Sequence, residues 1–80
     1  MPYIKQNERN LDLDFPLFYS PGTLNYFITK TILAYIEEKE LSYNTIATVT
    51  GVLENVKQEF YRRVAVPYED KKIAENGDVF

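Results

Sequence analysis

The fold is decided by the stretch TIATVTGVLENVKQEFYRRV at residues 45–64. Its apolar residues recur in alternating steps of three and four, which places them on one face of a helix. We call this face the seam, and its members are Ile46, Val49, Leu53, Val56 and Phe60. The β-branched run from Thr45 to Val52 would also suit a strand, but the unbroken seam favours a helix from about Thr45 to Val64. Gly51 costs about 1 kcal/mol relative to Ala there, a cost that a close crossing of another backbone would offset.

A second long helix is predicted ahead of the seam. Ser20 can cap its N-terminus with Pro21 at the first helical position, and Thr23 is a rival cap. Apolar residues then recur three or four apart along most of one face, namely Leu24, Phe27, Ile28, Ile32, Tyr35 and Ile36. The charged run at 37–40 ends this helix, and Ser42 or Asn44 caps the next one.

The C-terminal segment is predicted to form a short helix of its own. Pro67 should stop or kink the preceding helix, and it can open a new one whose first turn carries Glu69 and Asp70. Asn76-Gly77 is a good C-terminal stop, although an Asn-Gly hairpin turn is an alternative. We therefore expect an all-α fold with two long antiparallel helices, a short C-terminal helix and an extended N-terminal arm.

The arm should span residues 1–20 and the helical domain residues 21–80. Within the arm, Leu11, Leu13 and Phe15 alternate with Asp, so the stretch 11–19 is read as an extended segment, with a short helix from Pro16 as the weaker alternative. In the helical domain, four side chains are expected to form the core, namely Ile28, Ile32, Leu53 and Phe60. Two or three helices cannot bury seven Tyr and five Phe internally. Because Tyr and Phe are enriched at interfaces, we expect a homo-oligomer.

Composition excludes several classes of function. The chain has no Cys and no His, so it lacks thiolate ligands, the usual zinc ligand and the commonest general base. No Gly-rich phosphate loop and no calcium loop occurs, and the acids Glu69, Asp70, Glu75 and Asp78 are read as solvated charge. We predict no enzymatic activity, no catalytic residues, no metal and no cofactor.

Partners are constrained in the same way. A net charge of −3 disfavours nucleic acid, and residues 42–52 resemble only the first half of a helix-turn-helix motif. No apolar run approaches the length of a membrane span and no signal peptide is evident, so the chain is expected in the cytoplasm without a membrane partner.

One cluster of basic and aromatic residues is the candidate ligand- or partner-binding site. It comprises Tyr61, Arg62, Arg63, Tyr68, Lys71 and Lys72. Arg forks and Tyr rings suit a phosphate group or an acidic protein segment. The alternative is structural: Arg62 and Arg63 would complement the negative end of the helix dipole and pair with acids such as Glu59. Arg63 also falls on the next seam position after Phe60, where it must reach solvent or meet an acid across an interface.

Several stretches resemble a family of short, uncharacterised helical proteins from bacteriophages and some prokaryotes. These stretches include Leu24-Asn25-Tyr26, Gly51-Val52-Leu53-Glu54, Glu59-Phe60-Tyr61-Arg62-Arg63-Val64 and Pro67-Tyr68-Glu69-Asp70-Lys71-Lys72-Ile73. The resemblance implies a phage or host cytoplasm and carries no catalytic roles. We therefore expect a small accessory protein that binds and modulates a host or phage protein. The alternative is a protein that sequesters a phosphate-bearing small molecule such as a nucleotide.

Overall fold

The structure, a computed structural model, describes residues 2–9 and 20–80. A short 3-10 turn, η1 (Gln6–Glu8), lies in the N-terminal segment. It is followed by the helices α1 (Pro21–Lys39) and α2 (Tyr43–Phe60), a π turn, η2 (Tyr61–Ala65), and the helix α3 (Val66–Asn76). No strand occurs in the described parts of the chain, which confirms the all-α class. The expected extended segment at 11–19 lies outside the described residues.

Both long helices begin at capping boxes. Ser20 Oγ accepts a hydrogen bond from the Thr23 N–H at 3.1 Å, and Thr23 Oγ1 accepts one from the Ser20 N–H at 3.2 Å. Ser42 and Thr45 repeat this arrangement at 3.1 Å and 2.9 Å. These contacts satisfy backbone donors that the first helical turn leaves unpaired. Ser20 and Ser42 are thus confirmed as N-caps.

The turn between α1 and α2 holds the most buried side chain of the described residues. Thr45 is only 8% exposed, and its hydroxyl donates to the Glu40 carbonyl oxygen at 3.0 Å. Glu40 has a φ of 69°, a left-handed conformation that is uncommon outside Gly. The hydroxyl of Thr45 therefore ties α2 to the residue at which the chain reverses.

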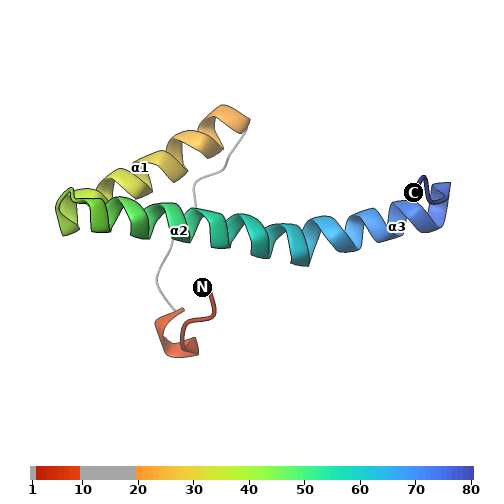
Figure 1. Ribbon diagram of the computed structural model, residues 1–80, viewed down its shortest axis with the longest axis horizontal. Coiled ribbons are helices and arrows are strands. Elements are labelled where there is room, and N and C mark those ends of the chain that lie inside the picture. The colour runs from red at the N-terminus through yellow and green to blue at the C-terminus, as the bar shows by residue number, and fades with distance from the viewer. Residues whose placement is uncertain (1, 10–19) are drawn as a thin grey trace.

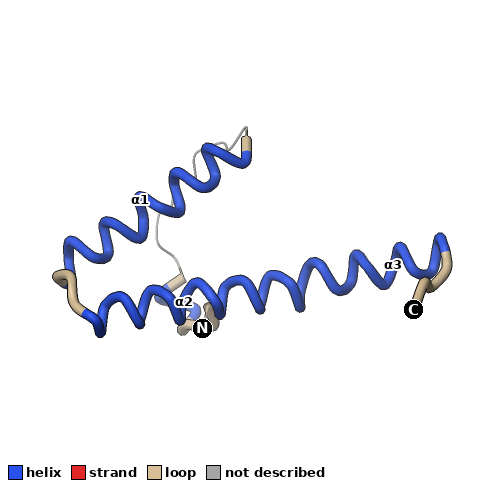
Figure 2. Tube along the Cα trace, turned by 45° about the horizontal axis from the view of Figure 1, so that its top comes forward, coloured by secondary structure: helices blue, strands red, loops and turns tan. Residues whose placement is uncertain are grey.

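The two helices diverge from this turn as the arms of a V (Figure 1), and Figure 2 shows the same opening from another side. Near the turn, Ile32 and Tyr35 of α1 and Val49 and Leu53 of α2 line a groove of about 220 Å³. The chain reverses as expected, but a pair of antiparallel helices packed along their length is not confirmed.

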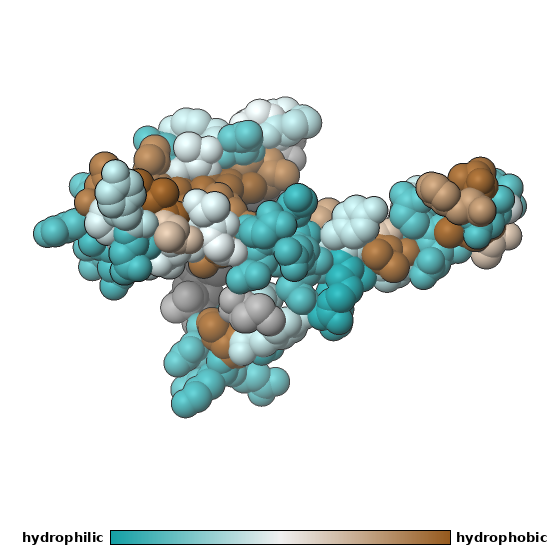
Figure 3. All heavy atoms as spheres, in the orientation of Figure 1, coloured by the Kyte–Doolittle hydropathy of each residue, from teal (hydrophilic) through white to brown (hydrophobic). Residues whose placement is uncertain are grey.

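Because α1 and α2 diverge, the prediction that four of their side chains form a buried core is wrong. None of the described hydrophobic side chains is buried: Ile28, Leu53 and Phe60 are exposed, and Ile32 is half-buried. Apolar side chains gather on the surface over α1 and α2 and again near the far end of α3 (Figure 3). The reason is geometric, because diverging helices cannot enclose side chains between them. The radius of gyration is 16.6 Å, whereas a compact domain of this length has about 12 Å.

The separate C-terminal helix is not confirmed either, because α2, η2 and α3 form one continuous helix (Figure 1). The Val66 N–H donates to the Tyr61 carbonyl oxygen, five residues back, as a π turn requires. Proline in a regular α-helix clashes with the carbonyl four residues before it. The wider turn just ahead of Pro67 relieves this conflict, so the helix continues through Pro67 and the predicted stop is wrong.

The end of α3 does match expectation. Gly77 has a φ of 91° and its N–H donates to the Ile73 carbonyl oxygen at 2.8 Å, as a C-terminal glycine cap does. At Gly51, by contrast, no backbone crosses: a Cβ added there would meet nothing within 4 Å. None of the described helices is long and apolar enough to cross a membrane.

Candidate functional site

The six residues of the basic–aromatic cluster lie along one continuous stretch of helix. Tyr61, Arg62 and Arg63 belong to η2, and the other three belong to α3. From Arg62 to Lys72 the helix rises by about 15 Å. The cluster is thus spread over a convex rod, and the described residues do not fold it into a cage around one small ligand.

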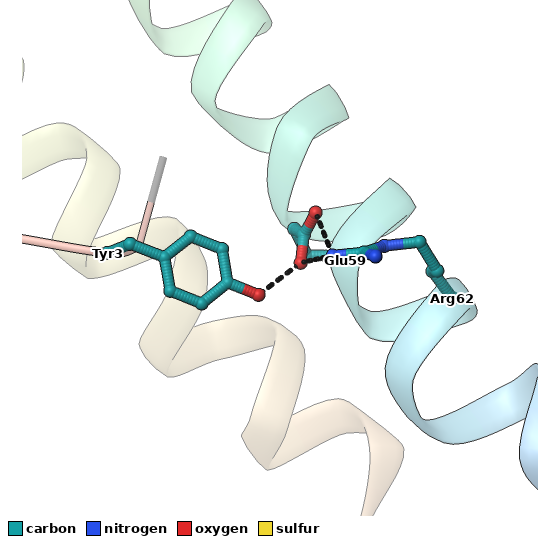
Figure 4. Close-up of polar contacts among 3 residues, drawn as sticks. All are labelled: Tyr3, Glu59 and Arg62. Atoms are coloured by element: carbon teal, nitrogen blue, oxygen red, sulfur yellow. Dashed lines mark hydrogen bonds and ion pairs between the residues drawn. The ribbon is translucent and has the colours of Figure 1, made fainter.

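Arg62 is held by Glu59 on the preceding turn (Figure 4). Its Nη2 donates to both oxygens of Glu59, at 3.0 and 3.1 Å. The Tyr3 hydroxyl, from the N-terminal segment, donates to Oε2 of the same carboxylate at 2.5 Å. The hydrogen bond from Tyr3 and then that from Arg62 lower the pKa of Glu59, while Glu59 raises the pKa of Arg62. Glu59 therefore stays ionised and fastens the N-terminal segment to the long helix.

The sequence predicted the Glu59–Arg62 pair but missed Tyr3. Tyr3 stands in a polar stretch, fifty-six positions away from Glu59, and no local pattern connects the two. Its one signal is that it is an aromatic residue in the largely polar stretch 1–10. Such a residue needs a contact for both its ring and its hydroxyl.

Lys72 is engaged in a similar local way. Its Nζ lies 5.5 Å from the centre of the Tyr68 ring and 3.3 Å from Glu75 Oε2. Both contacts lie on the surface, where each contributes 1 kcal/mol at most, by the usual order of magnitude. Among the described carboxylates, none forms an ion pair with Arg63 or Lys71.

The π turn corrects the expected position of Arg63. A π turn closes its hydrogen bond over one more residue than an α turn, so the seam position one turn after Phe60 passes from Arg63 to Val64. One further turn brings Tyr68 onto the same face. We call the face formed by Val56, Phe60, Val64 and Tyr68 the distal seam.

A second surface lies on another side of the helix. A shallow groove of about 430 Å³ is lined by Glu54, Lys57, Gln58, Tyr61, Arg62 and Val66. Tyr61 is 60% exposed and Val66 40%. They are five residues apart across the π turn, which aligns them along one side of the helix. We call Tyr61, Arg62 and Val66 the junction face.

The charge around the junction face differs from that of the whole chain. Between Lys57 and Lys72 there are five basic and three acidic residues, whereas the net charge of the chain is −3. Among the described residues no three acidic side chains gather closely enough to hold a metal ion. The site thus offers apolar surface beside cations.

These features define a small, all-helical domain whose apolar surfaces lie outside. The chain belongs to a family described as "Domain of unknown function (DUF6899)", which matches residues 1–79. Membership in an uncharacterised family agrees with the resemblance seen in the sequence. No curated protein and no solved structure matches the chain.

Proposed function

We propose that this chain is a non-enzymatic accessory protein that binds a segment of another protein through the junction face. The observation that carries the proposal is the exposure of Tyr61 and Val66 beside the cation of Arg62. Tyr and Arg are among the residue types that are enriched at the centres of protein interfaces. The partner should present an apolar side chain flanked by acids, because the surrounding stretch of helix has a positive balance.

The setting follows from the resemblance to short phage proteins. It favours a phage or host protein as the partner and the cytoplasm as the place of binding. Binding along an exposed helix would modulate the partner by covering part of its surface, and it requires no reacting group on this chain.

The alternative, sequestration of a phosphate-bearing small molecule, has less support. The favourable observation is that Arg63 and Lys71 pair with none of the described carboxylates. Against it, a small ligand needs a concave site that buries most of its surface, and these cations lie along a rod. Arg62 is already held by two carboxylate oxygens.

The test is affinity capture from lysate of the cells that encode the chain, with wild type and Val66→Glu compared. Val66→Glu should abolish capture, since it adds negative charge to the apolar centre of the junction face. Val64→Glu is the matched control, because it makes the same change on the distal seam and should leave capture intact. Equal capture by all three proteins would reject the junction face.

Thermal melting tests the alternative. Ligand at about a hundred times its dissociation constant would stabilise the fold by about 2.7 kcal/mol. On the protein-binding proposal, neither ATP nor inorganic phosphate shifts the melting temperature. A shift of several degrees that disappears in the double variant Arg62→Ala, Arg63→Ala would favour the phosphate-binding alternative instead.

A further inference from the structure

The distal seam is an apolar face that nothing in the described chain covers. Its four side chains are between 53% and 61% exposed. They follow one another along the continuous helix formed by α2, η2 and α3, from which α1 diverges (Figure 1). The groove lined by Leu24, Ile28, Ile32 and Leu53, at the opening of the V, continues this apolar surface toward the turn.

The spacing of the side chains on the distal seam is symmetric about Arg62, and in the reverse direction each aromatic position meets a β-branched one. Val56 and Tyr68 lie equally far from Arg62, and so do Phe60 and Val64. If a second copy of the helix lies antiparallel with its two-fold axis at Arg62, Val56 faces Tyr68 and Phe60 faces Val64. Each contact then pairs an aromatic ring with a β-branched side chain. Such alternation of large and small residues lets two faces interlock without voids.

The same register agrees with the charges beside the seam. Glu59 and Arg63 stand one turn apart on one flank of the helix. An antiparallel pair brings equal flanks together, so the partner's Arg63 comes within one helical turn of Glu59, and the reverse holds by symmetry. Arg63, which pairs with none of the described carboxylates of its own chain, thereby gains an acidic neighbour.

The exposed area also suits a second copy. The accessible surface is 7634 Å², whereas a compact protein of 9.4 kDa exposes about 5,000 Å². The excess, about 2,600 Å², is well above the roughly 800 Å² per partner that a stable interface of standard size buries.

We infer that the distal seam is a homodimer interface, in which two long helices pair antiparallel about a two-fold axis at Arg62. The π turn is what makes the interface continuous, because it sets Val64 and Tyr68 in line with Val56 and Phe60. The partner's α3 then lies beside Leu53, at the opening of the V. This interface is separate from the junction face, so the dimer is free to bind another protein.

Sedimentation of the full chain at low micromolar concentration tests the inference. Wild type should have at least twice the mass of the 9.4 kDa chain. Val64→Glu should give a monomer of unchanged helix content, measured by circular dichroism, and Val66→Glu should remain a dimer. A monomeric wild type overturns the inference, and so does equal dissociation of the two variants. Neither result bears on capture of a partner by the junction face.

The antiparallel register has its own test, which does not depend on a disruptive substitution. The chain has no Cys, so Gln58→Cys or Asn44→Cys carries a single spin label away from the distal seam. Between copies, the labels should be offset along the helix axis by about 12 Å at position 58 and about 54 Å at position 44. Similar distances at the two positions would mean a parallel pair and would overturn the register.

Discussion

The variant Phe60→Ala distinguishes the contribution of Phe60 to the folding of a single chain from its contribution to the association of two chains. Fully burying a Phe side chain contributes about 1.5–3 kcal/mol. Phe60 is 61% exposed, so its burial within the single chain contributes roughly 1 kcal/mol. A dimer that covers the exposed part of the side chain would gain about 1–2 kcal/mol more. Since a symmetric dimer contains Phe60 twice, its dissociation free energy should fall by about 2–4 kcal/mol, which is a factor of about 30 to 900 in the dissociation constant.

The assay is the dissociation constant from sedimentation equilibrium, combined with chemical unfolding at two protein concentrations. Tyr61→Ala is the matched control, because Tyr61 is the next residue, has nearly the same exposed fraction at 60% and lies off the distal seam. It should leave the dissociation constant unchanged. If Phe60→Ala lowers the free energy of unfolding equally at both concentrations and leaves association unaltered, the assignment of Phe60 to an interface is refuted.

Three further predictions follow from local geometry. Gly51→Ala should raise the free energy of unfolding by about 1 kcal/mol, because the position is helical and a Cβ there has open space; a lower melting temperature would show that another backbone passes close by. Ser42→Ala should lower the free energy of unfolding by about 1 kcal/mol, whereas Asn44→Ala should not, since Ser42 alone caps α2. Because the pKa of Glu59 is lowered from 4.5, the contact with Tyr3 should stabilise the fold above that pH and be lost as the pH falls below it through the lowered pKa. Tyr3→Phe should raise the pKa of Glu59 in a carboxylate NMR titration, and an unchanged pKa would contradict the contact.

The sequence predicted those features that depend on neighbouring residues. Ser20 and Ser42 were identifiable as caps because a capping box operates over three residues. The steps of three and four from Ile46 to Phe60 predicted α2 because the period of a helix is set within a turn or two. Gly77 was identifiable for the same reason, since its positive φ completes a local hydrogen bond.

Features that depend on tertiary context could not be predicted in this way. Pro67 breaks most helices, and whether a π turn absorbs it depends on the energy of the whole helix. The core was misplaced because the periodicity of α1 and α2 shows which faces are apolar, but not whether the two helices close on each other. The contact between Tyr3 and Glu59 joins distant parts of the chain and leaves no periodic trace. Among the candidate site residues, the local ion pair between Arg62 and Glu59 was predictable. The π turn places Val64 rather than Arg63 at the seam position after Phe60, and this was not predictable.

The π turn relates the two proposed surfaces to each other. Val64 and Val66 are two residues apart, so they point to nearly opposite sides of the helix. In a regular α-helix Arg63 would interrupt the distal seam, and Tyr61 and Val66 would fall out of line. One extra residue in a single turn corrects both alignments, and the hydrogen bond from Val66 to Tyr61 closes that turn. The conformation that accommodates Pro67 is therefore the same one that keeps the proposed interface between copies apart from the proposed face for another protein.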